Sequence, residues 1–151
     1  MAVTVKQITL WRKEAQNAPG VLAEVLEPLA ASGANLRLVM GYALGDTGRA
    51  AVEVFPVSGK KSTAAATQVG LHTAQVSALL VEGDDRPGLG AAMARGVANA
   101  GVNIEFVVAQ TVGRKFSAVF GFRTPEDARA AAKAIKAAAK PARPARSSKK
   151  R

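Results

Sequence analysis

An internal repeat at an offset of 68 residues constrains the fold of this chain more than any other feature of its sequence. Residues 18–36 align with residues 86–104. The identical pairs are Pro19 and Pro87, Gly20 and Gly88, Ala23 and Ala91, Ala30 and Ala98, Gly33 and Gly101, and Asn35 and Asn103. Apolar residues also coincide at the helical spacing i, i+4, i+8, as Val21, Val25 and Leu29 in one copy and Leu89, Met93 and Val97 in the other. The chain is therefore predicted to contain two copies of one structural unit.

Each copy has the same predicted order of elements. The first copy reads as a strand at about 5–12, a helix opened by Pro19 and closed near Gly33, strands at about 35–43 and 49–57, and a helix at about 60–70. The second reads as a strand at about 76–82, a helix at about 87–100, strands at about 103–111 and 116–123, and a helix at about 125–139 that is opened by Thr124, Pro125 and Glu126. Proline in the first turn of a helix and glycine just past its end are typical of helix termini. Because strand–helix–strand crossovers are right-handed, this order predicts a ferredoxin-like layer of helices on an antiparallel sheet.

The predicted fold class is α+β, with two βαββαβ modules at residues 1–75 and 76–139. Alternation places Ile104, Phe106 and Val108 on one face of a strand, and Phe116, Ala118, Phe120 and Phe122 on one face of the next. One face of each sheet is thus expected to be apolar and covered by helices.

The sequence gives little indication of a last strand in either module. Only residues 71–75 remain for it in the first module, where it must be short or run on into the next strand. The second module has no recognisable last strand before the Lys/Pro/Arg-rich segment that follows Ala139. We expect the missing edge to be supplied by the other module or by another subunit, and we expect a homodimer.

Pro28 and Gly96 stand at equivalent positions inside the first helix of each copy, where each weakens a helix relative to alanine. Either the kink is tolerated, or both helices approach a neighbouring backbone closely at these positions.

The net charge of +10 is concentrated at the C-terminus. Residues 140–151 hold six basic residues and no acidic one, so residues 1–139 carry the remaining +4. This segment has no apolar side chain larger than alanine or proline, and we predict that it is disordered because it cannot offset its ordering entropy. Its charge predicts a weak, sequence-independent contact with nucleic acid or another polyanion.

Composition excludes several classes of site. The chain has no cysteine, and its one histidine, His72, would leave a metal site to be built from carboxylates alone. No Ser/His/Asp arrangement, phosphate loop or paired-carboxylate motif is recognisable, so we expect no enzyme, no cofactor and no metal. No window approaches about 18 uninterrupted apolar residues, and residues 1–13 do not resemble a secretion signal. We therefore expect a cytoplasmic protein that does not enter a membrane.

The segment from Val81 to Leu89, Val-Glu-Gly-Asp-Asp-Arg-Pro-Gly-Leu, is followed by Ala-Gly-Val-Asn-Ile at 100–104. Together they resemble the signature of the ACT domain family, in which a strand leads through Asp/Asn-x-Pro-Gly into a helix that ends in Gly-x-Asn-Ile. The first copy carries the same pattern as Asn-Ala-Pro-Gly at 17–20 and Gly-Ala-Asn-Leu at 33–36. The resemblance covers roughly residues 5–139. A chain made of two such modules and little else is similar to the small tandem ACT proteins of bacteria. This resemblance implies a non-catalytic regulatory protein that binds an amino acid at domain or subunit interfaces.

The resemblance to serine-binding members of the family implies ligand contacts from Asn17 and Asn35 in the first copy and from Asp85 and Asn103 in the second. A histidine that some of those members carry two residues before the first of these positions is Ala15 or Gly83 here, so serine specificity does not follow. The predicted ligand-binding residues are Asn17, Pro19, Gly20, Val21, Leu22, Asn35, Asp85, Arg86, Pro87, Gly88, Leu89, Gly90 and Asn103.

General chemistry supports the same positions. The backbone donors at a helix N-terminus and its partial positive charge suit an α-carboxylate, and Asp85 could pair with an α-ammonium.

Two alternatives remain open. The Pro-Gly and Gly-x-Asn segments are also common helix punctuation. In that case the folded part serves as a dimerisation scaffold, and its basic tail contacts nucleic acid or another polyanion. A further hypothesis is a transcription-related regulator. Because no helix-turn-helix is visible in the sequence, such a regulator would act through a partner protein.

Overall fold

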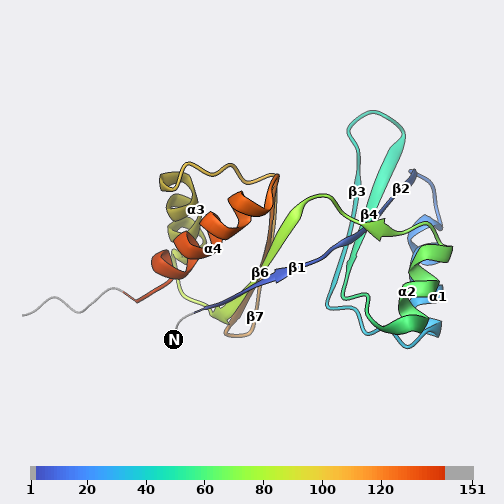
Figure 1. Ribbon diagram of the computed structural model, residues 1–151, viewed down its shortest axis with the longest axis horizontal. Coiled ribbons are helices and arrows are strands. Elements are labelled where there is room, and N and C mark those ends of the chain that lie inside the picture. Colours follow the sequence, from blue (N-terminus) through green and yellow to red (C-terminus); the bar gives the residue numbers. More distant parts are fainter. Residues whose placement is uncertain (1–2, 142–151) are drawn as a thin grey trace, which may run out of the picture. The chain divides into compact units, whose positions relative to one another are not determined.

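The computed structural model describes residues 3–141, which form two four-stranded sheets, each covered by two helices (Figure 1). The middle module, residues 8–78, contains β2 (Trp11–Gln16), α1 (Val21–Ala31), β3 (Leu38–Ala43), β4 (Arg49–Phe55), α2 (Gly59–Gln68) and β5 (His72–Thr73). The terminal module, residues 3–7 and 79–141, contains β1 (Thr4–Ile8), β6 (Ser77–Asp84), α3 (Leu89–Asn99), β7 (Phe106–Val112), β8 (Lys115–Phe122) and α4 (Pro125–Ala138). The sheet orders are β3-β4-β2-β5 and β1-β6-β8-β7, which are the same order in the two modules. The predicted α+β fold, with the βαββαβ pattern present twice, is confirmed.

The N-terminal strand belongs to the terminal module. β1 lies beside β6, where Thr4 Oγ1 donates to the backbone oxygen of Glu82 at 3.4 Å. The single strand predicted at about 5–12 is therefore wrong, since β1 ends at Ile8 and β2 begins at Trp11 in the other sheet. The chain's own N-terminal strand thus provides the edge that the second copy lacks. Residues 3–7 therefore lie in the terminal module, whereas the predicted boundary of 1–75 placed them in the first module.

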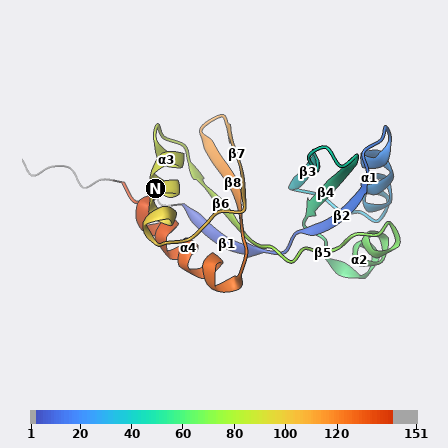
Figure 2. The same ribbon diagram turned by 90° about the horizontal axis from the view of Figure 1, so that it is seen from above.

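The short last strand predicted for the first copy is present as β5, which pairs with β2 through Trp11 opposite Thr73 and Arg12 opposite His72. In the middle module α1 and α2 cover one face of the sheet (Figure 2), and Val25, Leu29, Val52, Val54, Ala66 and Leu71 form its core.

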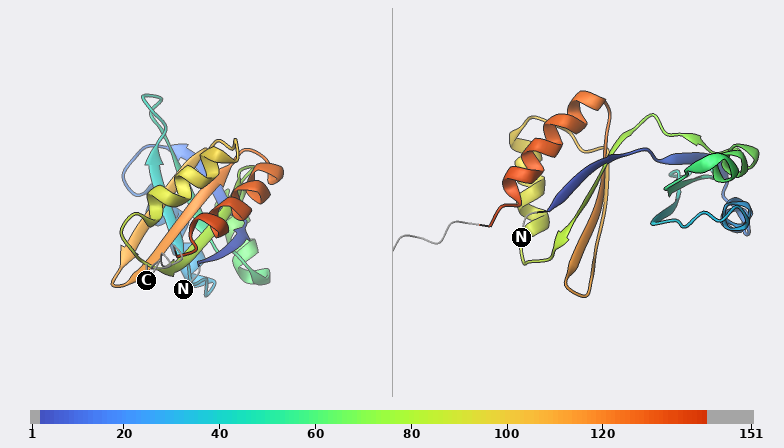
Figure 3. Two further views of the ribbon diagram at one scale, coloured as in Figure 1. Left: turned by 90° about the vertical axis from the view of Figure 1, so that its left-hand side faces the viewer. Right: turned by 60° about the horizontal axis from the view of Figure 1, so that its bottom comes forward.

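In the terminal module α3 and α4 lie side by side on one face of the sheet (Figure 3). Its core residues come from both helices, from β6 and β8, and from Val3 just before β1. They include Val3, Leu79, Val81, Leu89, Met93, Val97, Phe116, Ala118, Phe120, Phe122, Ala128, Ala131 and Ile135. The helix-facing row of β8 is the one that alternation predicted.

The predicted row on β7 is only partly correct. Ile104 packs against the core, but it precedes the strand. Phe106 pairs with Gly121 and Val108 pairs with Val119, whereas the helix-facing Phe120 pairs with Val107. Because paired residues share a face, Phe106 and Val108 lie on the face without helices. A side-chain carbon at Gly121 would come within 2.1 Å of the Phe106 ring, so the glycine makes room for that ring.

Both repeat helices end in the same hydrogen-bond pattern. In α1 the amide of Gly33 donates to Ala30 and the amide of Ala34 donates to Leu29, at 3.0 and 3.1 Å. In α3 the amides of Gly101 and Val102 donate to Ala98 and Val97. These are the two bonds of a Schellman motif, so both glycines act as predicted, as helix stops.

Gly96 is a point of close approach between α3 and α4. A side-chain carbon at Gly96 would lie 3.0 Å from the Ala138 Cβ and 3.2 Å from the Ala134 backbone oxygen. The close-approach hypothesis is confirmed for α3.

Among residues 3–141 no helix is both long and apolar enough to cross a membrane. The predicted disorder of the C-terminal segment concerns residues that lie outside this range, apart from Lys140 and Pro141.

Candidate functional site

Two equivalent loops enter α1 and α3, and each is held by the same kind of bond. The amide of Asn17 donates to the Gly48 oxygen at 2.9 Å, in the turn between β3 and β4. The amide of Asp85 donates to the Arg114 oxygen at 2.8 Å, in the turn between β7 and β8. The two predicted ligand positions are thus tethered through the backbone, which leaves their side chains uninvolved in the tether.

The loop of the terminal module has a second tether. Lys115, at the start of β8, forms an ion pair with Asp84, at the end of β6, and this bond lowers the pKa of the Asp84 carboxyl. Both side chains are largely exposed, so the pair adds little stability, but it joins the same two segments as the backbone bond does.

The helices begin two residues later than predicted. Gly20 and Gly88 are the N-cap residues, with φ of 91° and 82°, and the helices start at Val21 and Leu89. The prolines therefore precede the caps and do not occupy the first turn. Residues that carry a side chain rarely adopt this left-handed backbone conformation, which explains why the repeat has glycine at both positions.

Space above both caps is open. No heavy atom lies within 4 Å of the position that a side-chain carbon would take at Gly20, Gly88 or Gly90. Neither cap glycine supplies a side chain to bond the first-turn amides. Each loop therefore leaves open space beside its cap glycine, at the end of the helix where the first-turn amides lie.

The predicted residues differ in exposure. Leu89 is buried in the core at 2% exposure, Val21 and Arg86 are half-buried, and the rest are exposed. Arg86 Nη2 donates to the Ala139 backbone oxygen at 3.3 Å, so its guanidinium binds the C-terminal end of α4.

One module cannot bring all of its predicted residues onto one ligand. Asn35 and Asn103 follow the C-terminal ends of α1 and α3, whereas Asn17 and Asp85 precede the N-terminal ends. Each helix has 11 residues, which corresponds to a length of about 16 Å. The β3 and β7 strands begin at Leu38 and Phe106, so the two asparagines also precede the strands that they were predicted to open.

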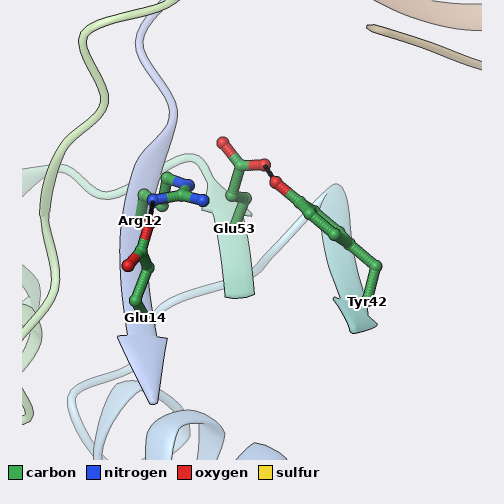
Figure 4. A network of polar contacts seen from close by, with 4 residues as sticks. All are labelled: Arg12, Glu14, Tyr42 and Glu53. Carbon is green, nitrogen blue, oxygen red and sulfur yellow. Dashed lines mark hydrogen bonds and ion pairs between the residues drawn. The ribbon is translucent and has the colours of Figure 1, made fainter. Parts of the chain in front are cut away.

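A polar network that sequence reasoning missed lies on the face of the middle module's sheet that carries no helices (Figure 4). Arg12, Glu53 and Tyr42 come from three adjacent strands and point toward one another, and Glu14 lies beside Arg12. The Tyr42 hydroxyl donates to Glu53 Oε2 at 2.7 Å, and Arg12 donates to Glu14. Glu53 is only 2% exposed, so these neighbours solvate a carboxylate that water does not reach.

The network shifts the pKa values of its other members. Partial burial and then the hydrogen bond to Glu53 raise the pKa of Tyr42. The neighbouring guanidinium of Arg12 lowers the pKa of the exposed Glu14 carboxyl. Sequence reasoning did not identify Tyr42 or Glu53 as members of a polar network. The available signal was Glu53 itself, a lone carboxylate within the apolar run Ala-Val-Glu-Val-Phe.

Within residues 3–141, no cluster of three or more histidine, aspartate or glutamate side chains is close enough to hold a metal ion.

Comparison with known proteins finds the fold but no close sequence relative. The sequence matches no protein-family model and no curated protein. The ligand-free regulatory subunit of aspartate kinase from Thermus thermophilus matches with a TM-score of 0.62 and 21% identity, over 91% of this chain and 97% of that chain. A protein from Bacteroides thetaiotaomicron matches with a TM-score of 0.69 and 16% identity, over 85% and 88% of the two chains.

Aspartate kinase from Clostridium acetobutylicum, described as an allosteric enzyme, matches with a TM-score of 0.60 and 12% identity. The match covers 91% of this chain and 34% of that chain. The likeness in all three cases is one of fold. The structure neighbours and the twofold βαββαβ pattern together show that this chain has the fold of a small tandem ACT-domain protein.

Proposed function

We propose that this chain is a non-catalytic regulatory protein that binds an amino acid at the N-termini of α1 and α3. The observation that carries the proposal is that one loop is built twice. Both copies have the backbone tether to a hairpin turn, the left-handed glycine cap and the open space above it.

The loops have the chemistry that an amino acid requires. An α-carboxylate accepts from amides of the first helical turn, where the helix dipole also favours negative charge. The Asn17 side chain offers both a donor and an acceptor, and Asp85 offers a carboxylate for the α-ammonium. The terminal module combines Asp85 with Gly90, whose lack of a side chain keeps the approach open, so we propose that its site is the primary one.

A second copy of the chain completes each site in this proposal. A loop residue and an asparagine at opposite ends of one helix are too far apart to bind the same small ligand, but a module from another copy can bring its Asn35 or Asn103 to the loop. Both modules have an exposed edge strand suited to such pairing. The equivalent residues Val39 on β3 and Val107 on β7 are 42% and 50% exposed, and each pairs with a residue that faces the core.

Solved structures of the same fold support a regulatory role, since one is described as the regulatory subunit of aspartate kinase. Regulation by an amino acid requires that the ligand bind two arrangements of the modules with different affinity. A site shared between copies meets this requirement, because its affinity depends on how the copies are arranged.

Thermal unfolding of the full chain in the presence of each of the twenty amino acids tests the proposal. A ligand at 100 times its dissociation constant stabilises the folded state by about 2.7 kcal/mol, which is a clear shift in Tm. We expect one chemical group of amino acids to raise the Tm. The proposal is wrong if none of them does so at saturating concentration.

Matched variants locate the site. Asp85→Ala and Asn103→Ala are expected to abolish the shift. The controls Asp46→Ala and Asn99→Ala remove the same side chains from other exposed positions, and we expect them to retain it. A shift that survives both site variants would place the ligand elsewhere.

A further inference from the structure

Almost all of the net positive charge of this chain lies in one continuous stretch. Residues 128–151 contain nine lysine or arginine residues and no acidic residue, whereas residues 1–127 contain twelve basic and eleven acidic residues. The net charge of +10 is therefore +9 in the last part of the chain and +1 in the rest. This stretch begins within α4, well before the C-terminal segment that the charge count first identified.

The folded part of the stretch carries its charges on one side of α4. Arg129, Lys133 and Lys136 follow one another at i, i+4 and i+7, and Lys140 comes two residues after the helix ends. All four side chains are exposed. Ala128, Ile135 and Ala139 are buried, and each lies one position before a member of the row. The cations therefore form a strip along the flank of the helix, next to its buried face.

Three of these cations meet at one cavity. An open cavity of about 620 Å³ between β1 and α4 is lined by Arg129, Lys133 and Lys136 together with Val5, Gln7, Leu79 and small alanines of the helix. None of its lining residues is acidic. Arg129 also contacts Glu126 at 3.2 Å, but both side chains are more than 60% exposed, and such pairs are weak and easily exchanged. An anion that enters this cavity meets three positive charges.

We propose that the basic strip, defined as Arg129, Lys133, Lys136 and Lys140, binds the phosphate backbone of duplex DNA without reading its sequence. Duplex DNA carries one negative charge per roughly 1.7 Å of its axis, and a row of lysine and arginine binds it by releasing condensed counterions. Successive charges on the helix are about 4.5 to 6 Å apart along its axis, so one edge of the duplex can contact several of them.

The composition of the strip favours the DNA backbone over other anions. Residues 128–151 contain no aromatic side chain on which the bases of a single strand could stack, and alanine fills most positions between the charges. A membrane-binding helix needs a free apolar face, but the apolar face of α4 is buried in the core of its module. This inference does not depend on the proposed amino-acid site, because it involves none of the same residues.

Fluorescence anisotropy of a labelled duplex DNA, titrated with the full chain at several salt concentrations, tests the proposal. Lys133→Gln/Lys136→Gln removes two charges and keeps two good helix formers. We expect it to weaken binding by roughly tenfold at physiological salt, and to make the slope of log K against log salt less negative by about 2. The matched control is Lys60→Gln/Lys61→Gln, which removes two exposed charges from α2 and should bind like the unchanged chain. Circular dichroism checks that both variants fold.

Three results would overturn the proposal. The first is that the full chain does not bind the duplex at all. The second is that the α4 variant binds like its control, in which case the C-terminal segment alone makes the contact. The third is that poly-glutamate or vesicles containing phosphatidylserine bind as tightly as DNA, which would assign the strip to acidic proteins or to membranes.

Discussion

At the scale of single residues, the folded chain places the buried carboxylate of Glu53 next to the Tyr42 hydroxyl, which donates a hydrogen bond to it. Glu53 faces away from the helices, in a cross-strand row with Met40 on one side and Arg12 on the other. A carboxylate at 2% exposure is stable only because hydrogen bonds and nearby positive charge replace the lost water. The network thus ties three strands of the middle module together through polar side chains.

Tyr42 reports directly on this network because it is the only tyrosine of the chain. Its pKa is raised by partial burial and by the hydrogen bond to Glu53. A tyrosine whose folded pKa is raised stabilises the folded state fully below its usual pKa near 10, and this contribution is lost as the pH rises through the folded pKa. We predict that tyrosinate absorbance titrates at a higher pH in the folded chain than in the chain unfolded by denaturant.

The variant Glu53→Gln separates the effect of partial burial on the Tyr42 pKa from the effect of Glu53. It removes the negative charge next to the phenol, so the Tyr42 midpoint should fall toward its usual value, whereas Glu24→Gln on the exposed side of α1 should leave it unchanged. Equal midpoints in the folded and unfolded chains would refute the network.

At the scale of elements, the two modules share hydrogen-bond patterns that the sequence made predictable. The helix stops at Gly33 and Gly101, the start of α4 at Thr124 and the order of strands all follow from periodicity and terminus chemistry. Thr124 caps its helix as expected, accepting from the Asp127 amide at 3.1 Å.

The division between β1 and β2 could not be predicted. Both strands alternate, and two residues separate them, so the pattern of residues 4–16 reads as one strand. Only the long-range pairing of β1 with β6 shows that the chain changes sheets at this point, and such pairing leaves no local signal. For the same reason, the sequence identified the loop residues of the candidate site but not the row of Arg12, Tyr42 and Glu53, which three strands bring together.

The pairing of β1 with β6 can be tested by a disulfide. A side-chain carbon at Gly83 would lie 3.4 Å from the Val3 Cβ, close to the separation that a disulfide needs, and the chain has no other cysteine. We predict that Val3→Cys/Gly83→Cys forms a bond within one chain under oxidising conditions, detectable by mass spectrometry of a digest. The pair Thr9→Cys/Gly83→Cys, which moves the first cysteine beyond the end of β1, should not form it. Bonds only between chains would mean that β1 pairs with another molecule.

At the scale of the whole molecule, one chain forms two modules of the same fold, and the terminal module is built from both ends of the sequence. The middle module is thus an insertion between β1 and β6 of the terminal module. Each module offers a loop at the start of one helix and an asparagine after its end, and the helix between them is too long for one ligand to touch both. We therefore propose that regulation by an amino acid depends on assembly, with a second copy supplying the missing asparagine.

Complementation between two variants tests this claim most directly. One variant carries Asn17→Ala/Asp85→Ala and lacks the loop side chains, and the other carries Asn35→Ala/Asn103→Ala and lacks the asparagines beyond the helices. Calorimetry with the amino acid that gives the largest thermal shift should find no binding to either variant alone. After the two are unfolded and refolded together, mixed assemblies contain sites with a loop from one chain and an asparagine from the other, and we predict that binding returns with the original affinity at a reduced number of sites. Binding that stays absent in the mixture, or that persists in either variant alone, would contradict a site shared between copies.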